Sequence, residues 1–120
     1  MDCERFELGD VPLLSGEVLQ SAKLSYKTYG KLNQDSSNVV LLPTFYTGTH
    51  KRNEGFFGTG RAIDPKHHFI ISINLFGNGF SSSPSNALKP QDGPRFPQIS
   101  LWDNISVSYT HLTLPTILLV

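Results

Sequence analysis

Residues 39–50 read Val-Val-Leu-Leu-Pro-Thr-Phe-Tyr-Thr-Gly-Thr-His, and the rest of the chain is interpreted outward from them. Four consecutive apolar residues between Asn38 and Pro43 predict a short strand buried on both faces, as in a parallel sheet. The small and hydroxylated residues that follow, at 44–49, are typical of backbone that lies close to a ligand. We therefore expect the end of this strand to form part of an anion site.

A second buried strand is expected at residues 69–73, Phe-Ile-Ile-Ser-Ile. Between the two strands, residues 53–63 predict a short helix that is weakened by three glycines. A strand, a helical crossover and a second strand predict a βαβ unit, with ligand chemistry at the carboxyl ends of parallel strands. Loops 44–50 and 74–83 both begin at such ends.

The N-terminal part predicts antiparallel strands. Residues 6–8 and 16–19 are short extended segments, and the Gly-Asp pair and the proline between them are turn residues, which favours a hairpin. Residues 22–29 alternate with a period of two, so one face is expected on the core and the lysine-bearing face in solvent. Gly30 ends this strand.

The last third of the chain gives conflicting signals. Residues 80–97 contain four prolines and predict an ordered loop over the sheet. Ser100 and Asp103 have the spacing of a capping box, so a helix is expected from Leu101. Residues 107–120 are rich in β-branched residues and have no helical pattern, which disagrees with that start signal.

Residues 107–116, Val-Ser-Tyr-Thr-His-Leu-Thr-Leu-Pro-Thr, resemble the translation of a transposase-end sequencing adapter. We therefore expect residues 1–106 to be a domain fragment and residues 107–120 to be a non-native tail. A genuine strand of unusual composition is the alternative. The parent nucleotide sequence distinguishes the two. Native coding sequence that continues through Val107 without adapter bases would exclude the adapter interpretation.

Composition and charge exclude several classes of function. With 120 residues, 38% hydrophobic and 17% charged, the chain suits one small globular domain. Ten basic and ten acidic residues balance, which argues against nucleic-acid and membrane partners. The single cysteine, Cys3, excludes an internal disulfide, and no signal-peptide pattern follows Met1, so a cytoplasmic location is expected.

Three short motifs are weak candidates for chemistry. Residues 79–83, Gly-Phe-Ser-Ser-Ser, come within one residue of the G-x-S-x-G nucleophile motif but end in serine. The Gly-x-Gly pairs at 58–60 and 77–79 lack a third glycine or a lysine and are interpreted as turns. His67 and His68 would point to opposite faces of an extended segment, so no metal site is expected.

Several segments together resemble the start of homoserine O-acetyltransferase-like members of the α/β-hydrolase superfamily. The resemblance runs in order from about residue 6 to residue 105. It implies the N-terminal portion of an α/β-hydrolase fold, with a mixed, mostly parallel sheet that begins with an antiparallel hairpin. The segments that carry the resemblance are residues 14–19, 22–30, 43–48, 74–79, 81–86 and 96–103.

What the resemblance implies is acyl transfer by a Ser-His-Asp triad. An acyl-CoA co-substrate acylates the serine, and homoserine, as in methionine biosynthesis, or water in hydrolytic relatives then removes the acyl group. All three triad residues would follow residue 106, so neither a catalytic residue nor activity is expected in this chain alone. The resemblance further implies a small-molecule substrate, no bound cofactor or metal, and a full-length parent that could be a homodimer.

The resemblance also assigns residues 44–48 to a loop that contributes to the oxyanion hole. Matching Thr47 and Gly48 to the family's Thr-Gly pair places the backbone N–H donor near Tyr46. The best-known acetyltransferases have His-Ala-Leu where this chain has Thr44, Phe45 and Tyr46. The resemblance therefore does not imply that homoserine is the acceptor. Further residues expected to line the pocket are His50, Asn74, Gly77, Asn78 and Gly79.

Alternatives to an acyltransferase stay open: an esterase of the same fold, a non-catalytic module that binds a small anion, and an inactive structural fragment. A G-x-S-x-G-like motif in the downstream coding sequence would favour an enzyme. The resemblance also places the strand at 39–43 between two neighbours. Without one of them its apolar edge is unpaired, so we expect the isolated chain to be insoluble or molten.

Overall fold

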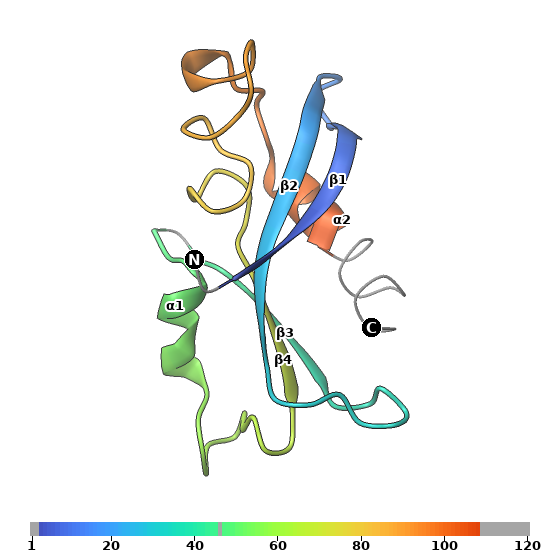
Figure 1. Ribbon diagram of the computed structural model, residues 1–120, viewed down its shortest axis with the longest axis vertical. Helices are drawn as coiled ribbons and strands as arrows, with labels where there is room; N and C mark the ends of the chain where they lie inside the picture. The colour runs from blue at the N-terminus through green and yellow to red at the C-terminus, as the bar shows by residue number, and fades with distance from the viewer. Residues whose placement is uncertain (1–2, 46, 109–120) are drawn as a thin grey trace.

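A computed structural model describes residues 3–45 and 47–108, which form one mixed sheet with short helices on either side (Figure 1). The sheet has the order β1-β2-β4-β3. Figure 1 shows α1 and α2 on opposite sides of it. The elements, in chain order, are β1 (Glu4–Pro12), β2 (Val18–Tyr29), β3 (Val39–Pro43), α1 (His50–Asn53), the 3₁₀ turn η1 (Glu54–Phe56), β4 (Phe69–Ile73), the 3₁₀ turn η2 (Gly93–Arg95) and α2 (Leu101–Val107).

The N-terminal hairpin is longer than predicted. The pair Gly9 and Asp10, expected in the turn, lies inside β1, where the register with β2 shifts on both sides of Gly9. The positive φ of Gly9, 72°, fits such a bulge, which bends the strand without ending it. The turn instead spans residues 13–17, where the N–H of Leu13 donates to the carbonyl oxygen of Glu17 at 2.8 Å.

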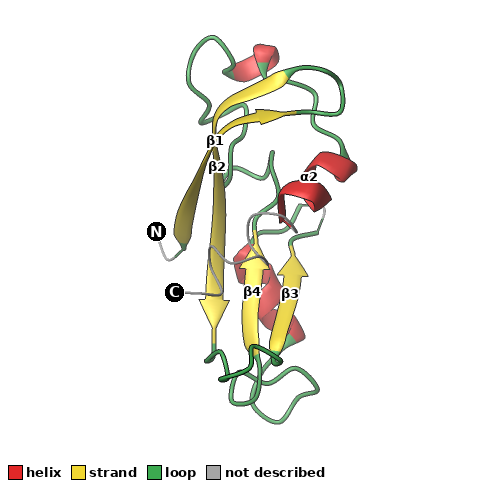
Figure 2. Cartoon of the chain, turned by 90° about the vertical axis from the view of Figure 1, so that its right-hand side faces the viewer, coloured by secondary structure: helices red, strands yellow, loops and turns green. Residues whose placement is uncertain are grey.

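The two buried strands lie where the sequence predicts them, and they pair in parallel (Figure 2). Val39 lies opposite Phe69, and Pro43 lies opposite Ile73. β4 is almost entirely buried between β2 and β3. The apolar residues of β3 are half-buried, contrary to the prediction of burial on both faces, because within the described residues β3 has a neighbour on one side only.

The crossover contains less helix than predicted. A helix was expected over residues 53–63, whereas α1 begins at His50 and only η1 follows it, ending at Phe56. Glycines explain the early end, because a glycine in a helix costs about 1 kcal/mol relative to alanine. Gly60 in addition has φ 79°, outside the right-handed helical region. The chain therefore reaches β4 mainly through turns.

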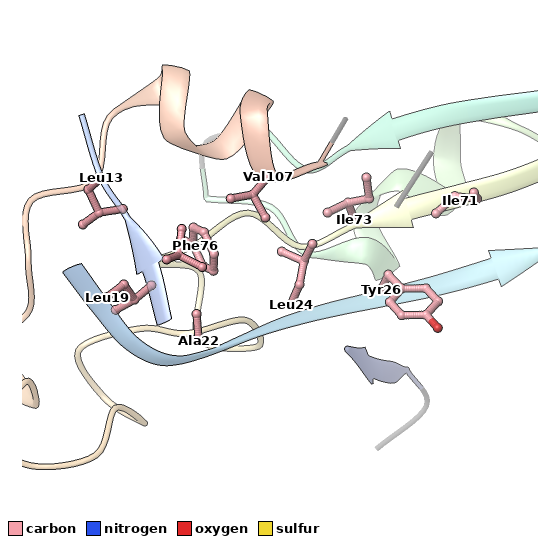
Figure 3. Packing of buried hydrophobic residues seen from close by; sticks show 10 residues of the cluster. Leu13, Leu19, Ala22, Leu24, Tyr26, Ile71, Ile73, Phe76 and Val107 are labelled. Carbon is pink, nitrogen blue, oxygen red and sulfur yellow. The ribbon is translucent and has the colours of Figure 1, made fainter. Parts of the chain in front are cut away.

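The hydrophobic core lies on one face of the sheet (Figure 3). Leu24, Ile73, Phe76 and Val107 point into the same region from β2, β4, the loop after β4 and α2. The capping box predicted for α2 is present, with Ser100 and Asp103 as its two members. The helix includes Val107, whereas residues 109–120 lie outside the described part of the chain, so the adapter interpretation stays a prediction.

The opposite face of the sheet carries buried polar residues under α1. Ser25 of β2, Ser72 of β4 and Asn74 after β4 are all fully buried, as are His50 and Asn53 of α1. Asn53 donates from Nδ2 to Ser72 Oγ at 2.9 Å and to the Leu42 carbonyl oxygen at 3.0 Å. α1 is therefore attached to the sheet through hydrogen bonds. None of the helices within residues 3–45 and 47–108 is long and apolar enough to cross a membrane.

Candidate functional site

The loops that follow β3 and β4 meet at the carboxyl ends of these strands and form an open groove of about 410 Å³. The two strands are parallel and adjacent, so their ends lie at the same edge of the sheet. The groove is lined by uncharged residues: Thr44, Phe45, Thr47, Gly48 and Thr49 from the first loop, and Leu75, Phe76, Gly77 and Asn78 from the second.

The first loop is attached to the end of β4 at its entry. Thr44 is buried, and its N–H donates to the Ile73 carbonyl oxygen at 2.9 Å. Its hydroxyl Oγ1 accepts from the N–H of Leu75 at 3.1 Å. Thr44 therefore contributes both its backbone and its side chain to joining the two loops.

The same loop is attached a second time at its exit, through His50. The N–H of His50 donates to Asn74 Oδ1 at 3.0 Å, and Asn74 Nδ2 lies 3.0 Å from His50 Nδ1. The imidazole is fully buried, with its ring edge-on to Phe80 at 5.3 Å. His50 was expected to line the pocket as a loop residue. It lies behind the groove instead, because α1 begins at His50 and packs onto the sheet.

Between these two attachments the loop makes a tight turn. The N–H of Gly48 donates to the Phe45 carbonyl oxygen at 2.8 Å, and Thr47 has φ 65°. A Cβ added at Gly48 would lie 3.0 Å from the Phe45 ring, so this position favours glycine. Tyr46, the predicted oxyanion donor, lies outside the described residues, and its role stays a prediction.

Asn78 organises the second loop. Its Nδ2 donates to Asn74 Oδ1 at 2.8 Å, and its Oδ1 accepts from the N–H of Phe80 at 3.0 Å. Gly77 and Asn78, two of the residues named as possible pocket lining, lie along the groove. Gly79 and Asn74, which were expected there too, do not line it: Gly79 is exposed, and Asn74 is fully buried behind it.

The serines at 81–83, weighed as a nucleophile motif, serve as structural hydrogen-bonding groups. Ser81 Oγ donates to the Asn74 carbonyl oxygen and accepts from the N–H of Ser25 at 2.7 Å. Ser82 Oγ accepts from the N–H of Lys23 at 2.8 Å. These bonds attach the second loop to β2. Sequence reasoning missed this role, although a run of small hydroxyl residues after a buried strand is the signal for it.

No charged side chain is among the residues that line the described groove, although the guanidinium of Arg52 lies 5.3 Å from the ring centroid of Phe45. Within the described ranges, no three His, Cys, Asp or Glu side chains come together to hold a metal ion. Backbone N–H bonds from Lys66 and then Gly60 lower the pKa of Asp64, which closes a turn in the crossover. Burial, followed by the charge of Glu4, raises the pKa of Tyr26 to about 12. The described groove thus offers hydroxyl, amide and backbone groups for binding a neutral or anionic ligand.

The comparisons with known proteins agree with this architecture. In a solved structure, the acetyl esterase MekB matches 93% of this chain with a TM-score of 0.89 and 40% identity. This chain has part of an α/β-hydrolase fold. The match covers 33% of the MekB chain, and no protein-family model matches the sequence.

Among curated proteins, the relatives of this partial α/β-hydrolase are esterases and homoserine acyltransferases. An ethyl acetate hydrolase of Pseudomonas veronii is 40% identical over 111 residues, which are 92% of this chain and 32% of the relative. A homoserine O-acetyltransferase of Sulfurimonas autotrophica is 34% identical over 109 residues, 78% of this chain and 30% of the relative. The chain thus spans about a third of the length of the relatives it matches.

Proposed function

We propose that this chain is the N-terminal part of a serine-dependent enzyme that hydrolyses small acetyl esters. The observation that carries the proposal is the groove between loops 44–49 and 75–78, at the sheet edge where α/β folds bind ligands. The 40% identity to an ethyl acetate hydrolase supports the choice of substrate class. The nucleophile, the acid and the catalytic histidine come from the part of the parent beyond residue 106.

In the proposed reaction, a serine Oγ attacks the ester carbonyl carbon and the carbonyl oxygen becomes an oxyanion. The catalytic histidine takes the serine proton and gives it to the alcohol, which leaves as the C–O bond breaks; water, deprotonated by the same histidine, then attacks the acyl-serine and releases acetate, and the serine regains its proton. Residues 44–48 supply one backbone N–H to the oxyanion, near Tyr46. An uncharged groove suits this task, because aligned N–H dipoles stabilise the developing charge without reorganising.

The second candidate is acyl transfer from acyl-CoA to an alcohol such as homoserine. The 34% identity to a homoserine O-acetyltransferase favours it. Against it stand Thr44, Phe45 and Tyr46, where the acetyltransferases that the chain resembles have His-Ala-Leu. In either case we propose a cytoplasmic enzyme without a bound cofactor. A homodimer of the full-length parent is proposed for either candidate, and a role in methionine biosynthesis belongs to the second.

The test is an assay of the uninterrupted protein that carries this sequence, recovered from its parent coding sequence. With p-nitrophenyl acetate and ethyl acetate we expect hydrolysis, and with acetyl-CoA plus homoserine we expect little transfer. Efficient transfer with weak hydrolysis would establish the second candidate instead. A folded protein that does neither, but binds a small anion, would support a binding module and contradict both enzyme proposals.

A further inference from the structure

We propose that Asn74 is a positioning residue that holds the two loops of the groove together, by fixing His50 at the exit of the first loop and Asn78 in the second. This inference rests on the proposed function of the groove. The side chain of Asn74 is fully buried and forms hydrogen bonds to three separate segments: β2, the start of α1 and the second loop of the groove. Among the described residues that line the groove, it is hydrogen-bonded to Asn78.

The amide of Asn74 uses its full hydrogen-bonding capacity. Its Oδ1 accepts from the N–H of His50 at 3.0 Å and from Nδ2 of Asn78 at 2.8 Å. Its Nδ2 donates to His50 Nδ1 at 3.0 Å and to Ser25 Oγ at 3.3 Å. An amide has two acceptor positions and two donor hydrogens, and all four are engaged here.

The network determines the orientation of both side chains. A backbone N–H can only donate, so the atom that faces the N–H of His50 must be the oxygen of Asn74. Nδ2 then faces His50 Nδ1, which must accept, and the imidazole carries its proton on Nε2. A buried network satisfied in this way specifies one arrangement, because any alternative leaves a buried polar group unpaired.

Asn74 follows β4 directly and is therefore placed to contact both loops of the groove. Residues 73–75 attach the first loop at both ends, through Thr44 at its entry and through His50 at its exit. The entry uses backbone groups of Ile73 and Leu75, whereas at the exit the side chain of Asn74 accepts the N–H of His50 and donates to its ring. Removing this side chain therefore loosens the exit but not the entry, and it also removes the acceptor that Asn78 uses on the facing wall of the groove.

The experiment compares Asn74→Ala and Asn74→Asp in the uninterrupted protein. Asn38→Ala is the matched control, because Asn38 also joins separate segments through three hydrogen bonds but lies at the amino end of β3. Hydrogen exchange of residues 44–50 is the first readout. We expect faster exchange there in Asn74→Ala but not in Asn38→Ala, and unchanged exchange would overturn the positioning role whether or not the enzyme acts on acetyl esters.

The kinetic readout connects the position of the loop to catalysis. For Asn74→Ala we expect kcat on p-nitrophenyl acetate to fall roughly 10- to 100-fold with little change in KM, because the oxyanion forms only after binding. Asn74→Asp keeps the bonds from His50 N and Asn78 Nδ2 and should lie between Asn74→Ala and the parent. If Asn74→Ala does not fold, the test is the comparison of Asn74→Asp with the parent, in hydrogen exchange and in kcat.

The outcomes separate this inference from the proposed function. A parent without activity on acyl substrates contradicts the proposed function, while the exchange data still decide the role of Asn74. If the parent is active and the Asn74 variants change kcat and KM no more than Asn38→Ala does, the positioning role is contradicted. The proposed function is then unaffected.

Discussion

Asp103 connects the last helix to the first hairpin at the level of a single side chain. Its Oδ1 accepts from the N–H of Leu14 at 2.8 Å, and its Oδ2 accepts from the N–H of Ser100 at 2.9 Å. Burial raises the pKa of this carboxyl, but the hydrogen bonds from the Ser100 backbone, the Leu14 backbone and the Ser100 side chain outweigh burial and lower it overall. The ionised form is therefore the one that stabilises the fold.

A pH-dependent stability follows from this lowered pKa. The contribution of Asp103 should be complete above the pKa of the unfolded chain, about 4, and should be lost as the pH falls through the lower folded pKa. In the uninterrupted protein, Asp103→Asn should lower the free energy of unfolding by about 1 to 3 kcal/mol at neutral pH and flatten its acid dependence. Denaturant melts across this range measure it, with Glu7→Gln at an exposed carboxylate as control. Parallel acid profiles for parent and Asp103→Asn would contradict the role.

The backbone N–H of residue 46 is the proposed oxyanion donor, and its removal should slow catalysis. Tyr46→Pro in the uninterrupted protein deletes this donor and should lower kcat by roughly 100- to 1000-fold. Tyr46→Phe keeps the N–H and should retain most of the activity. Steady-state kinetics with a circular-dichroism check of the fold measure both. An intact Tyr46→Pro enzyme with the kcat of the parent would rule out position 46 as the donor.

The end of β2 is fixed by the crossover that passes over it. Gly30 has φ 83°, and a Cβ there would lie 2.2 Å from the His68 carbonyl oxygen and 2.6 Å from that of Pro65. Gly16 also has a positive φ, 93°, but has open space around it. An alanine at Gly16 would therefore introduce backbone strain alone, whereas an alanine at Gly30 would introduce strain and a steric clash.

We expect Gly16→Ala to destabilise the uninterrupted protein by about 1 to 2 kcal/mol through strain alone. Gly30→Ala should cost about 2 to 4 kcal/mol, because backbone atoms of the crossover must also move. Thermal or denaturant melts of the two variants give the difference. Equal losses would show that the crossover yields freely at this point.

The edge of β3 governs the behaviour of the isolated chain. Its four apolar residues are half-buried, and in the described part of the chain β3 pairs with β4 alone. An open apolar edge is a template for further strands. We expect the 120-residue chain to aggregate on expression and Val40→Lys to raise its soluble fraction. Size-exclusion chromatography and thioflavin fluorescence measure this, and a soluble monomer with a sharp cooperative melt would contradict it.

The elements that the sequence predicts correctly are those whose signal is local. Contiguous apolar residues predict β3 and β4, and the Ser100–Asp103 spacing predicts the start of α2. The prediction is wrong where distant contacts decide: Gly9 forms a bulge because β2 continues to pair around it, and α1 begins at His50 because Asn74 accepts its N–H. Neither partner can be read from the neighbouring sequence.

At the scale of the whole molecule, the βαβ pattern predicts that both loops begin at the carboxyl ends of parallel strands, and in the structure these loops line one groove. The pattern cannot predict the buried polar layer behind it. Ser25 and Asn74 are 49 positions apart in the sequence, and His50 and Asn74 are 24 apart, so their hydrogen bonds depend on the strand order. Whether a loop residue lines the groove or lies behind it, as His50 does, is decided by that packing.

We propose that this chain supplies the oxyanion-binding loop of an active site whose triad lies further along the parent. The most direct measurement is kcat/KM for p-nitrophenyl acetate, with the uninterrupted protein and the 120-residue chain assayed side by side. We expect saturable hydrolysis by the uninterrupted protein and none above background by the 120-residue chain. Saturable turnover by the 120-residue chain, or a folded uninterrupted protein that neither hydrolyses nor transfers acyl groups, would contradict it.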